Sequence, residues 1–126
     1  MKTIITTKNA PAPIGPYSQA VKSGNLIYVS GMVAKDPSTG NMVTANIKEE
    51  TQKVMENIRG VLVEAESKLD NIVKTTIFLT NMDDFAQVNE VYGSFFPNGN
   101  FPARETVQVS RLPLNVNIEI SVIAEA

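Results

Sequence analysis

The longest regular pattern in the chain is a stripe of mainly apolar residues near its middle. These residues recur at intervals of three and four, the spacing that gathers side chains along one face of an α-helix. They are Ile47, Thr51, Val54, Met55, Ile58, Val61, Leu62, Ala65 and Leu69. Asn46, with Glu49 three residues later, resembles a helix-capping box. The pattern therefore predicts a long amphipathic helix that begins after Asn46.

A second, shorter helix is predicted in the last third of the chain. Its inner face would carry Phe85, Val88, Tyr92, Phe95 and Phe96. Residues 97–100 contain a proline and a glycine, which end the helix.

Segments rich in β-branched and aromatic residues predict the strands. These segments are residues 2–7, 17–22, 25–30, 71–80, 104–111 and 117–125. The pair 17–22 and 25–30 reads as a hairpin that turns at Ser23 and Gly24, and residues 36–40 read as a second turn.

This order of elements favours an α+β domain, in which both helices lie on one face of a mixed sheet and bury their apolar stripes there. Ile118, Ile120 and Val122 indicate that at least one sheet face is apolar. The opposite face must be solvated or covered by another subunit, and we expect oligomerisation to cover it.

Composition narrows the chemistry. The 126 residues suit a single domain, residues 1–126, and include neither cysteine nor histidine. The missing cysteines exclude disulfides, thiolate metal sites and a cysteine nucleophile. The missing histidines remove the commonest general base and the commonest transition-metal ligand.

Charge and hydropathy indicate which partners to expect. The formal net charge is −2, and no basic stripe of the kind that nucleic-acid binders carry is visible. Residues 1–8 lack the apolar core of a signal peptide, and no apolar run is long enough to span a bilayer. We expect a cytoplasmic protein that binds neither nucleic acid nor membrane.

Arg104 is the first candidate for chemistry. It stands between a proline turn and a strand, and its guanidinium is a rigid fork that matches a carboxylate. On spacing alone, an arginine at the surface or in a salt bridge explains it as well.

Glu119 is the second candidate. Strand alternation places it on the face opposite Ile118 and Ile120, where a carboxylate could hold a water molecule. A solvent-facing strand glutamate is the alternative.

Weaker signals come from residues that a turn or a helix face would position. Tyr17 follows a stiff Gly-Pro step, and Gly31 after Ser30 allows a close approach of a ligand. A core tyrosine with its hydroxyl at the rim is the alternative for Tyr17, and a plain turn at the end of a strand is the alternative for Ser30 and Gly31. Asn89 shares the inner helix face, where a structural hydrogen bond also accounts for it.

Several segments together resemble the Rid family of reactive intermediate deaminases, also called the YjgF family. They run in family order along the whole chain: APAPIGPYSQAV at 10–21, VSG at 29–31, IVKTTIFL at 72–79, DFAQVN at 84–89, FPAR at 101–104, RLP at 111–113 and IEI at 118–120.

The resemblance implies a chorismate-mutase-like α+β fold, a homotrimer and sites in the clefts between subunits. It implies a RidA-like deaminase acting on 2-iminopropanoate and 2-iminobutanoate, which pyridoxal-phosphate-dependent serine and threonine dehydratases release. Arg104 would grip the substrate carboxylate and Glu119 would orient the attacking water. The pocket would be lined by Tyr17, Ser30, Gly31, Asn89 and the backbone around Thr106.

The departures from the family pattern are modest. Met32 and Glu105 stand where glutamine and serine are frequent, and Thr106 stands where cysteine or threonine is found. Alternation directs Glu105 away from the face of Arg104 and Thr106. The implied chemistry needs no metal and no organic cofactor, because a protonated imine is already electrophilic.

Three other functions compete with the deaminase. A regulatory trimer could bind small carboxylates through Arg104 without turning them over. An RNA-directed ribonuclease or translation inhibitor is a second, which the acidic charge and absent histidine disfavour. A chaperone-like interaction protein is the third, and no sequence feature supports it.

Overall fold

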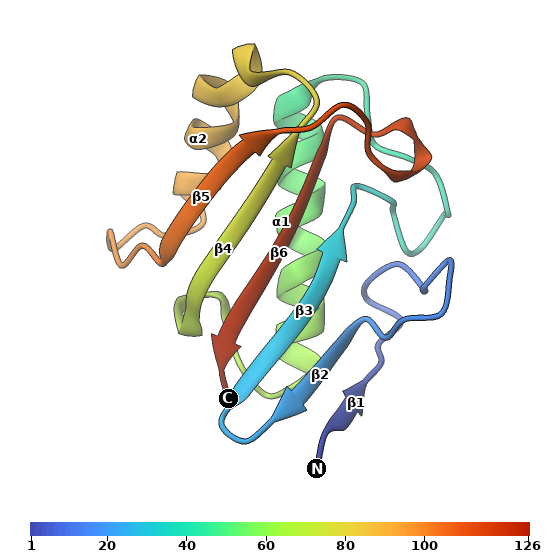
Figure 1. Ribbon diagram of the computed structural model, residues 1–126, viewed down its shortest axis with the longest axis vertical. Coiled ribbons are helices and arrows are strands. Elements are labelled where there is room, and N and C mark those ends of the chain that lie inside the picture. The colour runs from blue at the N-terminus through green and yellow to red at the C-terminus, as the bar shows by residue number, and fades with distance from the viewer.

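The fold is a six-stranded sheet with two helices behind it, described for residues 1–126 by a computed structural model (Figure 1). Along the sheet the strands lie in the order β1, β2, β3, β6, β4 and β5. Their bounds are Thr3–Ile5 for β1, Ala20–Ser23 for β2, Leu26–Met32 for β3, Ile72–Leu79 for β4, Ala103–Gln108 for β5 and Ile118–Glu125 for β6. All neighbouring strands are antiparallel except β4 and β5, so the sheet is mixed as expected.

Helix α1 (Ile47–Glu64) crosses behind the centre of the sheet, and α2 (Phe85–Ser94) lies beside it behind β4 and β5 (Figure 1). Asn46 caps α1, because its side chain accepts a hydrogen bond from the Glu49 N–H at 2.9 Å. None of the helices is long and apolar enough to cross a membrane.

The predicted stripe extends beyond the end of α1. The helix ends at Glu64, because Glu66 adopts a left-handed backbone with φ of 60° and the Ser67 N–H turns back to the Leu62 carbonyl. Leu69 lies in the following short helix η1 (Leu69–Asn71) and still joins the core.

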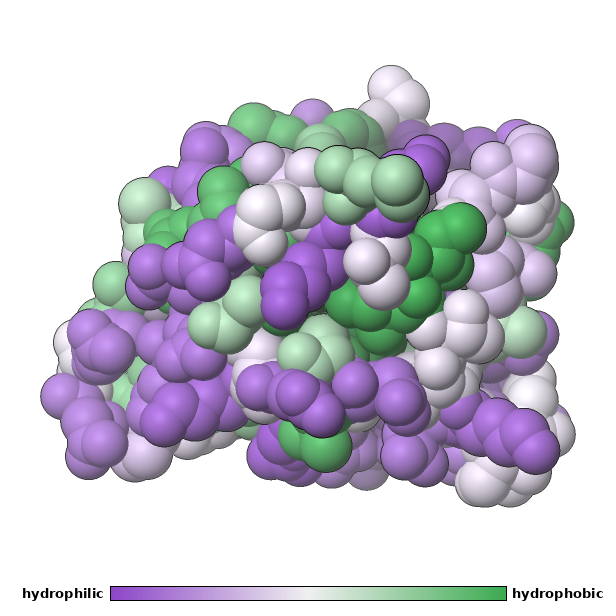
Figure 2. All heavy atoms as spheres, turned by 90° about the horizontal axis from the view of Figure 1, so that it is seen from below, coloured by the Kyte–Doolittle hydropathy of each residue, from purple (hydrophilic) through white to green (hydrophobic).

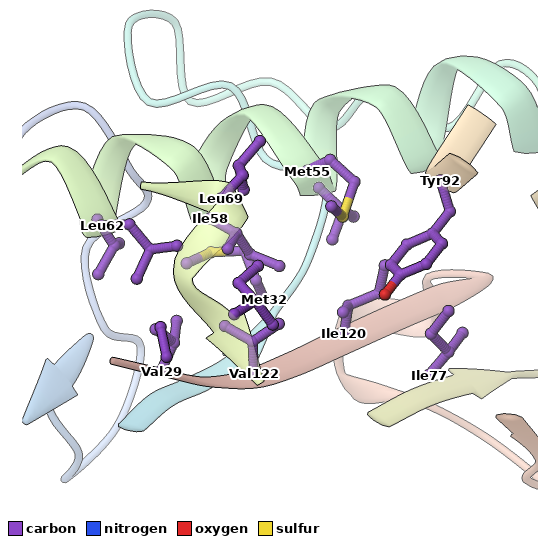
Figure 3. Close-up of a cluster of buried hydrophobic side chains, with 14 of the residues drawn as sticks. Val29, Met32, Met55, Ile58, Leu62, Leu69, Ile77, Tyr92, Ile120 and Val122 are labelled. Atoms are coloured by element: carbon purple, nitrogen blue, oxygen red, sulfur yellow. The ribbon is translucent and has the colours of Figure 1, made fainter. Parts of the chain in front are cut away.

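The core fills the space between α1 and the sheet. Val29, Met32, Ile120 and Val122 rise from the strands towards the helix (Figure 3). They meet α1 side chains, which include Met55, Ile58 and Leu62, while Tyr92 reaches the same layer from α2. The expected burial of both apolar stripes on one face is therefore confirmed, apart from Phe85, which is exposed.

The first strand of the hairpin begins later than expected, at Ala20 instead of residue 17. Gln19 explains the difference, because its buried side chain binds the preceding segment. Its carbonyl accepts from the Thr7 N–H at 2.7 Å, and its amide donates to the carbonyls of Thr7, Ala10 and Pro11. Tyr17 is thereby left in a loop.

No element of the chain covers the front face of the sheet, which we call the open face (Figure 1). It carries exposed apolar side chains, among them Ile4, Tyr28, Val73 and Val107. Apolar groups also reach the surface elsewhere: the end of the molecule near both termini mixes hydrophilic and hydrophobic side chains (Figure 2). The prediction of a second, uncovered face is confirmed.

Candidate functional site

Arg104 lies on the helix side of β5, the edge strand. It pairs with buried Thr75 of β4, so both side chains point towards the helices. Its guanidinium carbon lies 5.6 Å from the ring centre of Phe85 and 5.1 Å from that of Tyr92. The ion pairs of the chain are Lys48–Glu90, Lys53–Glu56 and Lys74–Glu105. Arg104 therefore forms no salt bridge within the chain, and its donors are available.

A groove opens at Arg104 between β5 and α2. It is lined by Asn89, Tyr92, Gly93, Phe101, Pro102 and Arg104. Burial raises the pKa of the Tyr92 phenol, whose hydroxyl donates to Thr75 Oγ1 at 2.9 Å. The phenol thus stays neutral and the ring supports the guanidinium.

Two polar atoms in this region have no hydrogen-bond partner. They are Asn89 Oδ1 and Thr106 Oγ1, and both are buried. The structural hydrogen bond considered for Asn89 is therefore absent, and the residue is half-buried rather than buried. Because an unpaired buried oxygen costs free energy, these atoms are suited to a ligand or a second subunit that supplies donors. We call Asn89, Arg104 and Thr106 the arginine group.

Glu119 lies on the open face of β6. Its neighbours Ile118 and Ile120 are fully buried towards the helices, and its own side chain shares the other face with Phe78 of β4. Burial raises the pKa of the Glu119 carboxyl, which has no hydrogen-bonding or ion-pairing partner in the chain to oppose the shift. A carboxylate with a raised pKa is a stronger base than an ordinary glutamate.

Gly31 makes room for this carboxylate. A Cβ atom at residue 31 would clash with Glu119 Oε2, so only glycine leaves the carboxylate in place. The pairing of β3 with β6 shifts between Val29 and Met32, which is the irregularity of a β-bulge. The group that comes close at Gly31 within the chain is the Glu119 side chain and not another backbone, while the approach of a ligand stays a prediction.

Ser30 and Tyr17 lie next to Gly31 and are held by the backbone. The Ser30 hydroxyl donates to the Ser18 carbonyl at 2.6 Å. The Tyr17 hydroxyl accepts from the Ile14 N–H at 3.3 Å, and the ring is 47% exposed, so Tyr17 is not a core residue. We call Tyr17, Ser30, Gly31 and Glu119 the glutamate group.

One chain does not bring the two groups together. Arg104 faces the helices from the edge strand, whereas Glu119 faces the open side two strands away, with β4 between them. A single chain therefore does not form a site that contains both Arg104 and Glu119, and the expected sites between subunits stay a prediction. The physical reason is that paired residues share a face, and Thr75 and Phe78, their respective partners on β4, lie on opposite faces.

Glu105 and Met32, which differ from the residues frequent in the family, lie outside the arginine group. Glu105 points to the open side, where it accepts from Thr76 Oγ1 at 2.7 Å and pairs with Lys74 at 3.1 Å. These contacts lower the pKa of the Glu105 carboxyl. Met32 is buried in the core. Alternation therefore predicted the direction of Glu105 correctly.

Sequence reasoning missed Glu50, a carboxylate of α1 with no exposed surface. Its Oε2 accepts from the N–H groups of Asn117 and Ile118 at 2.8 and 3.2 Å, and its Oε1 accepts from Asn117 Nδ2 at 2.7 Å. Glu50 thus holds the start of β6, next to Glu119. The signal was its position three residues after Ile47 and four before Val54, on the buried stripe.

The fold and the two groups define an α+β protein with a free arginine in an aromatic groove, a site suited to a small carboxylate. The family model described as Endoribonuclease L-PSP matches residues 7–126. A RutC family protein of Pyrococcus horikoshii is 49% identical over 124 residues, which cover 98% of each chain. The 2-iminobutanoate/2-iminopropanoate deaminase of Mus musculus is 44% identical over 124 residues, 98% of this chain and 91% of the mouse protein.

A solved structure of a Rid family protein from Yersinia pestis matches with a TM-score of 0.97 and 47% identity, and each chain is covered completely. The chain belongs to the Rid family, and its expected YjgF-like fold is confirmed.

Proposed function

We propose that this protein is a 2-iminobutanoate/2-iminopropanoate deaminase, which hydrolyses reactive imine or enamine acids to 2-keto acids and ammonia. The observation that carries the proposal is Arg104, a guanidinium in a groove with no carboxylate of its own chain to bind. The mouse relative with the deaminase name supports the substrate class.

We propose that the site is completed between subunits of a homotrimer. The arginine group and the glutamate group lie on opposite faces of one sheet, so a single substrate reaches both only if they come from different chains. The exposed apolar side chains of the open face supply a surface for such contacts.

The chemistry then needs few groups. Arg104 binds the substrate carboxylate through paired N–H donors, which fixes the imine carbon. The oxygen of a water molecule attacks the imine carbon while Glu119 accepts a proton from that water. Glu119 then returns the proton to the imine nitrogen. The resulting carbinolamine loses ammonia and leaves the keto group. Water and imine thus balance keto acid and ammonia, and no cofactor takes part.

The proposed substrates point to a functional partner. Imines of this kind are released by pyridoxal-phosphate-dependent threonine and serine dehydratases, so the protein would act on their products. Threonine dehydratase therefore provides the assay. Its imine is generated with and without this protein, and 2-ketobutyrate release is recorded. We expect faster release with the protein, and an unchanged rate would contradict the proposal.

A mixing experiment tests the shared site. Arg104→Ala and Glu119→Gln proteins are each expected to lose most of their activity. When the two are unfolded together and refolded, mixed trimers contain some sites with an intact arginine group and an intact glutamate group. Activity should return in the mixture only. A mixture as inactive as its parents would place both groups in one chain's site and refute the shared site.

A small-carboxylate sensor is the second candidate, because Asn89 and Arg104 line a groove to which Glu119 does not contribute. A sensor would bind 2-ketobutyrate in the absence of any turnover. Incubation with RNA tests the ribonuclease alternative. If the protein were a ribonuclease, RNA cleavage would be found in the same purification fractions as the protein.

A further inference from the structure

Leu114 holds an unusual backbone conformation. Its φ and ψ are 60° and 16°, in the left-handed region, and the following Asn115 also has a positive φ of 54°. Left-handed backbone is unfavourable for a leucine, and such strain is concentrated at functional sites. The conformation lies in the short helix η3 (Pro113–Asn115), directly before β6.

The strained backbone places the Leu114 side chain at a small pocket. Three segments form this pocket: the proline-rich loop of residues 11–17, the end of β3 and η3. Its volume is about 30 Å³, enough for one or two groups of the size of water. Ile14, Tyr17 and Leu114 line it, although each is about half exposed, at 57%, 47% and 51%.

This pocket and the Glu119 carboxylate share a wall. Gly31 lines the pocket, and the carboxylate lies against the same glycine. A compound whose reacting carbon lies beside Glu119 therefore has its side chain within reach of the pocket. The lining is largely apolar, which suits an alkyl group and not a charged one.

We propose that Leu114 is a specificity-determining residue, whose side chain closes this pocket and limits the substrate to side chains of one or two carbons. The inference rests on the proposed deaminase function and adds a residue and a size limit to it. The strained backbone persists because it directs the leucine into the pocket.

The test uses imines of increasing size. An amino-acid oxidase converts alanine, 2-aminobutyrate, norvaline and leucine to their 2-imino acids, and their hydrolysis is followed with wild type, Leu114→Ala and Leu114→Gly. For wild type, kcat/KM should fall at least ~10-fold between the two-carbon and three-carbon side chains. In both variants most of that difference should disappear, with the norvaline and leucine imines accelerated.

Glu66→Gly is the matched control for backbone strain. Glu66 also has a positive φ, but it follows α1 and lies outside the pocket. Glycine at either position relieves left-handed strain, so Glu66→Gly and Leu114→Gly should both raise Tm. Only the Leu114 variants should change the size preference. If Leu114→Ala and Leu114→Gly retain the wild-type ratio, the inference is wrong even though the deaminase stands.

Binding separates this inference from the function on which it rests. Calorimetry with 2-ketobutyrate and the longer 2-ketovalerate and 4-methyl-2-ketovalerate measures the pocket without turnover. A wild type that hydrolyses no imine would refute the deaminase. If its keto-acid preference also failed to change in Leu114→Ala, the pocket assignment would fail as well.

Discussion

Arg104 is held by aromatic rings, and this explains how a charged side chain stays both ordered and free. Phe85 and Tyr92 flank the guanidinium with cation–π contacts, and Tyr92 is itself fixed by Thr75. A carboxylate partner would instead compete with the substrate.

Arg104→Ala should abolish detectable acceleration of imine hydrolysis while leaving the fold intact. Each charge-assisted hydrogen bond to a carboxylate contributes roughly 1.5–3 kcal/mol, and the fork is lost completely. The dehydratase-coupled assay measures the loss of activity, and the circular dichroism spectrum measures whether the fold is intact.

Arg59→Ala is the control, because Arg59 also stacks on an aromatic ring, that of Phe95, at 5.5 Å. It lies outside the groove and should retain activity. Full activity in Arg104→Ala would mean that another residue binds the substrate carboxylate, and Arg111 is the next candidate.

Glu119→Gln should separate turnover from binding. The amide keeps the shape of the side chain but accepts no proton, so turnover should fall by about 10²–10⁴. Binding of 2-ketobutyrate, measured by calorimetry, should change little because Arg104 still holds the carboxylate. Unchanged turnover with weakened binding would instead favour the sensor.

The pH dependence of wild type should reflect the same carboxylate. Burial raises the pKa of Glu119. As the pH is lowered, the carboxylate therefore becomes protonated, and activity is lost, at a higher pH than an ordinary glutamate would give. A raised carboxyl pKa also means that folding stability declines as pH rises through that pKa. Glu119→Gln should lack this decline. A pH–rate profile and urea unfolding at several pH values measure the two effects.

At the scale of elements, the position of β6 depends on a buried contact with α1. Glu50 accepts hydrogen bonds from both backbone N–H groups at the start of the strand and from the Asn117 side chain. The helix therefore sets where β6 begins, and with it the place of Glu119.

Glu50→Ala should destabilise the protein by roughly 3 kcal/mol, because one buried and two partly buried donors lose their acceptor. Glu50→Gln should cost less, since its oxygen can still accept from both backbone groups and the Asn117 amide can reverse to accept from the new NH₂. Urea unfolding measures the difference. Glu49→Ala, on the same turn but exposed, should cost less than about 1 kcal/mol. Equal losses for Glu49→Ala and Glu50→Ala would contradict this role.

At the scale of the whole molecule, the two faces of the sheet differ in what covers them. The helices bury one face, while the open face presents apolar and half-buried side chains. Ile123 lies on this face of the central strand β6, between Tyr28 and Lys74.

Light scattering at micromolar concentration should give three times the chain mass of 13.7 kDa. Ile123→Glu should reduce the mass, because it places a charge on the proposed interface, and activity should fall with it. Val63→Glu should leave the trimer intact, since Val63 is exposed on α1, behind the sheet. A monomeric wild type would refute both the trimer and the shared site.

The sequence alone predicted the elements whose patterns are local. The stripe of α1, the cap at Asn46 and the direction of Glu105 follow from spacing of a few residues. One error fell where a side chain acts at a distance, because Gln19 delays β2 by binding residues 7–11. The other lies in the backbone, because the left-handed conformation of Glu66 ends α1 before the apolar stripe does.

Candidate residues could also be chosen from the sequence, because Arg104, Glu119 and Gly31 stand in motifs that resemble a known family. Only the tertiary structure decided how they relate. Alternation assigns a side chain to one of two faces of its own strand, but comparison between strands needs the pairing register. That register, Thr75 with Arg104 and Phe78 with Glu119, places the two groups on opposite faces. Strand pairing joins residues far apart in the chain, and no local pattern of hydrophobic and polar positions encodes it.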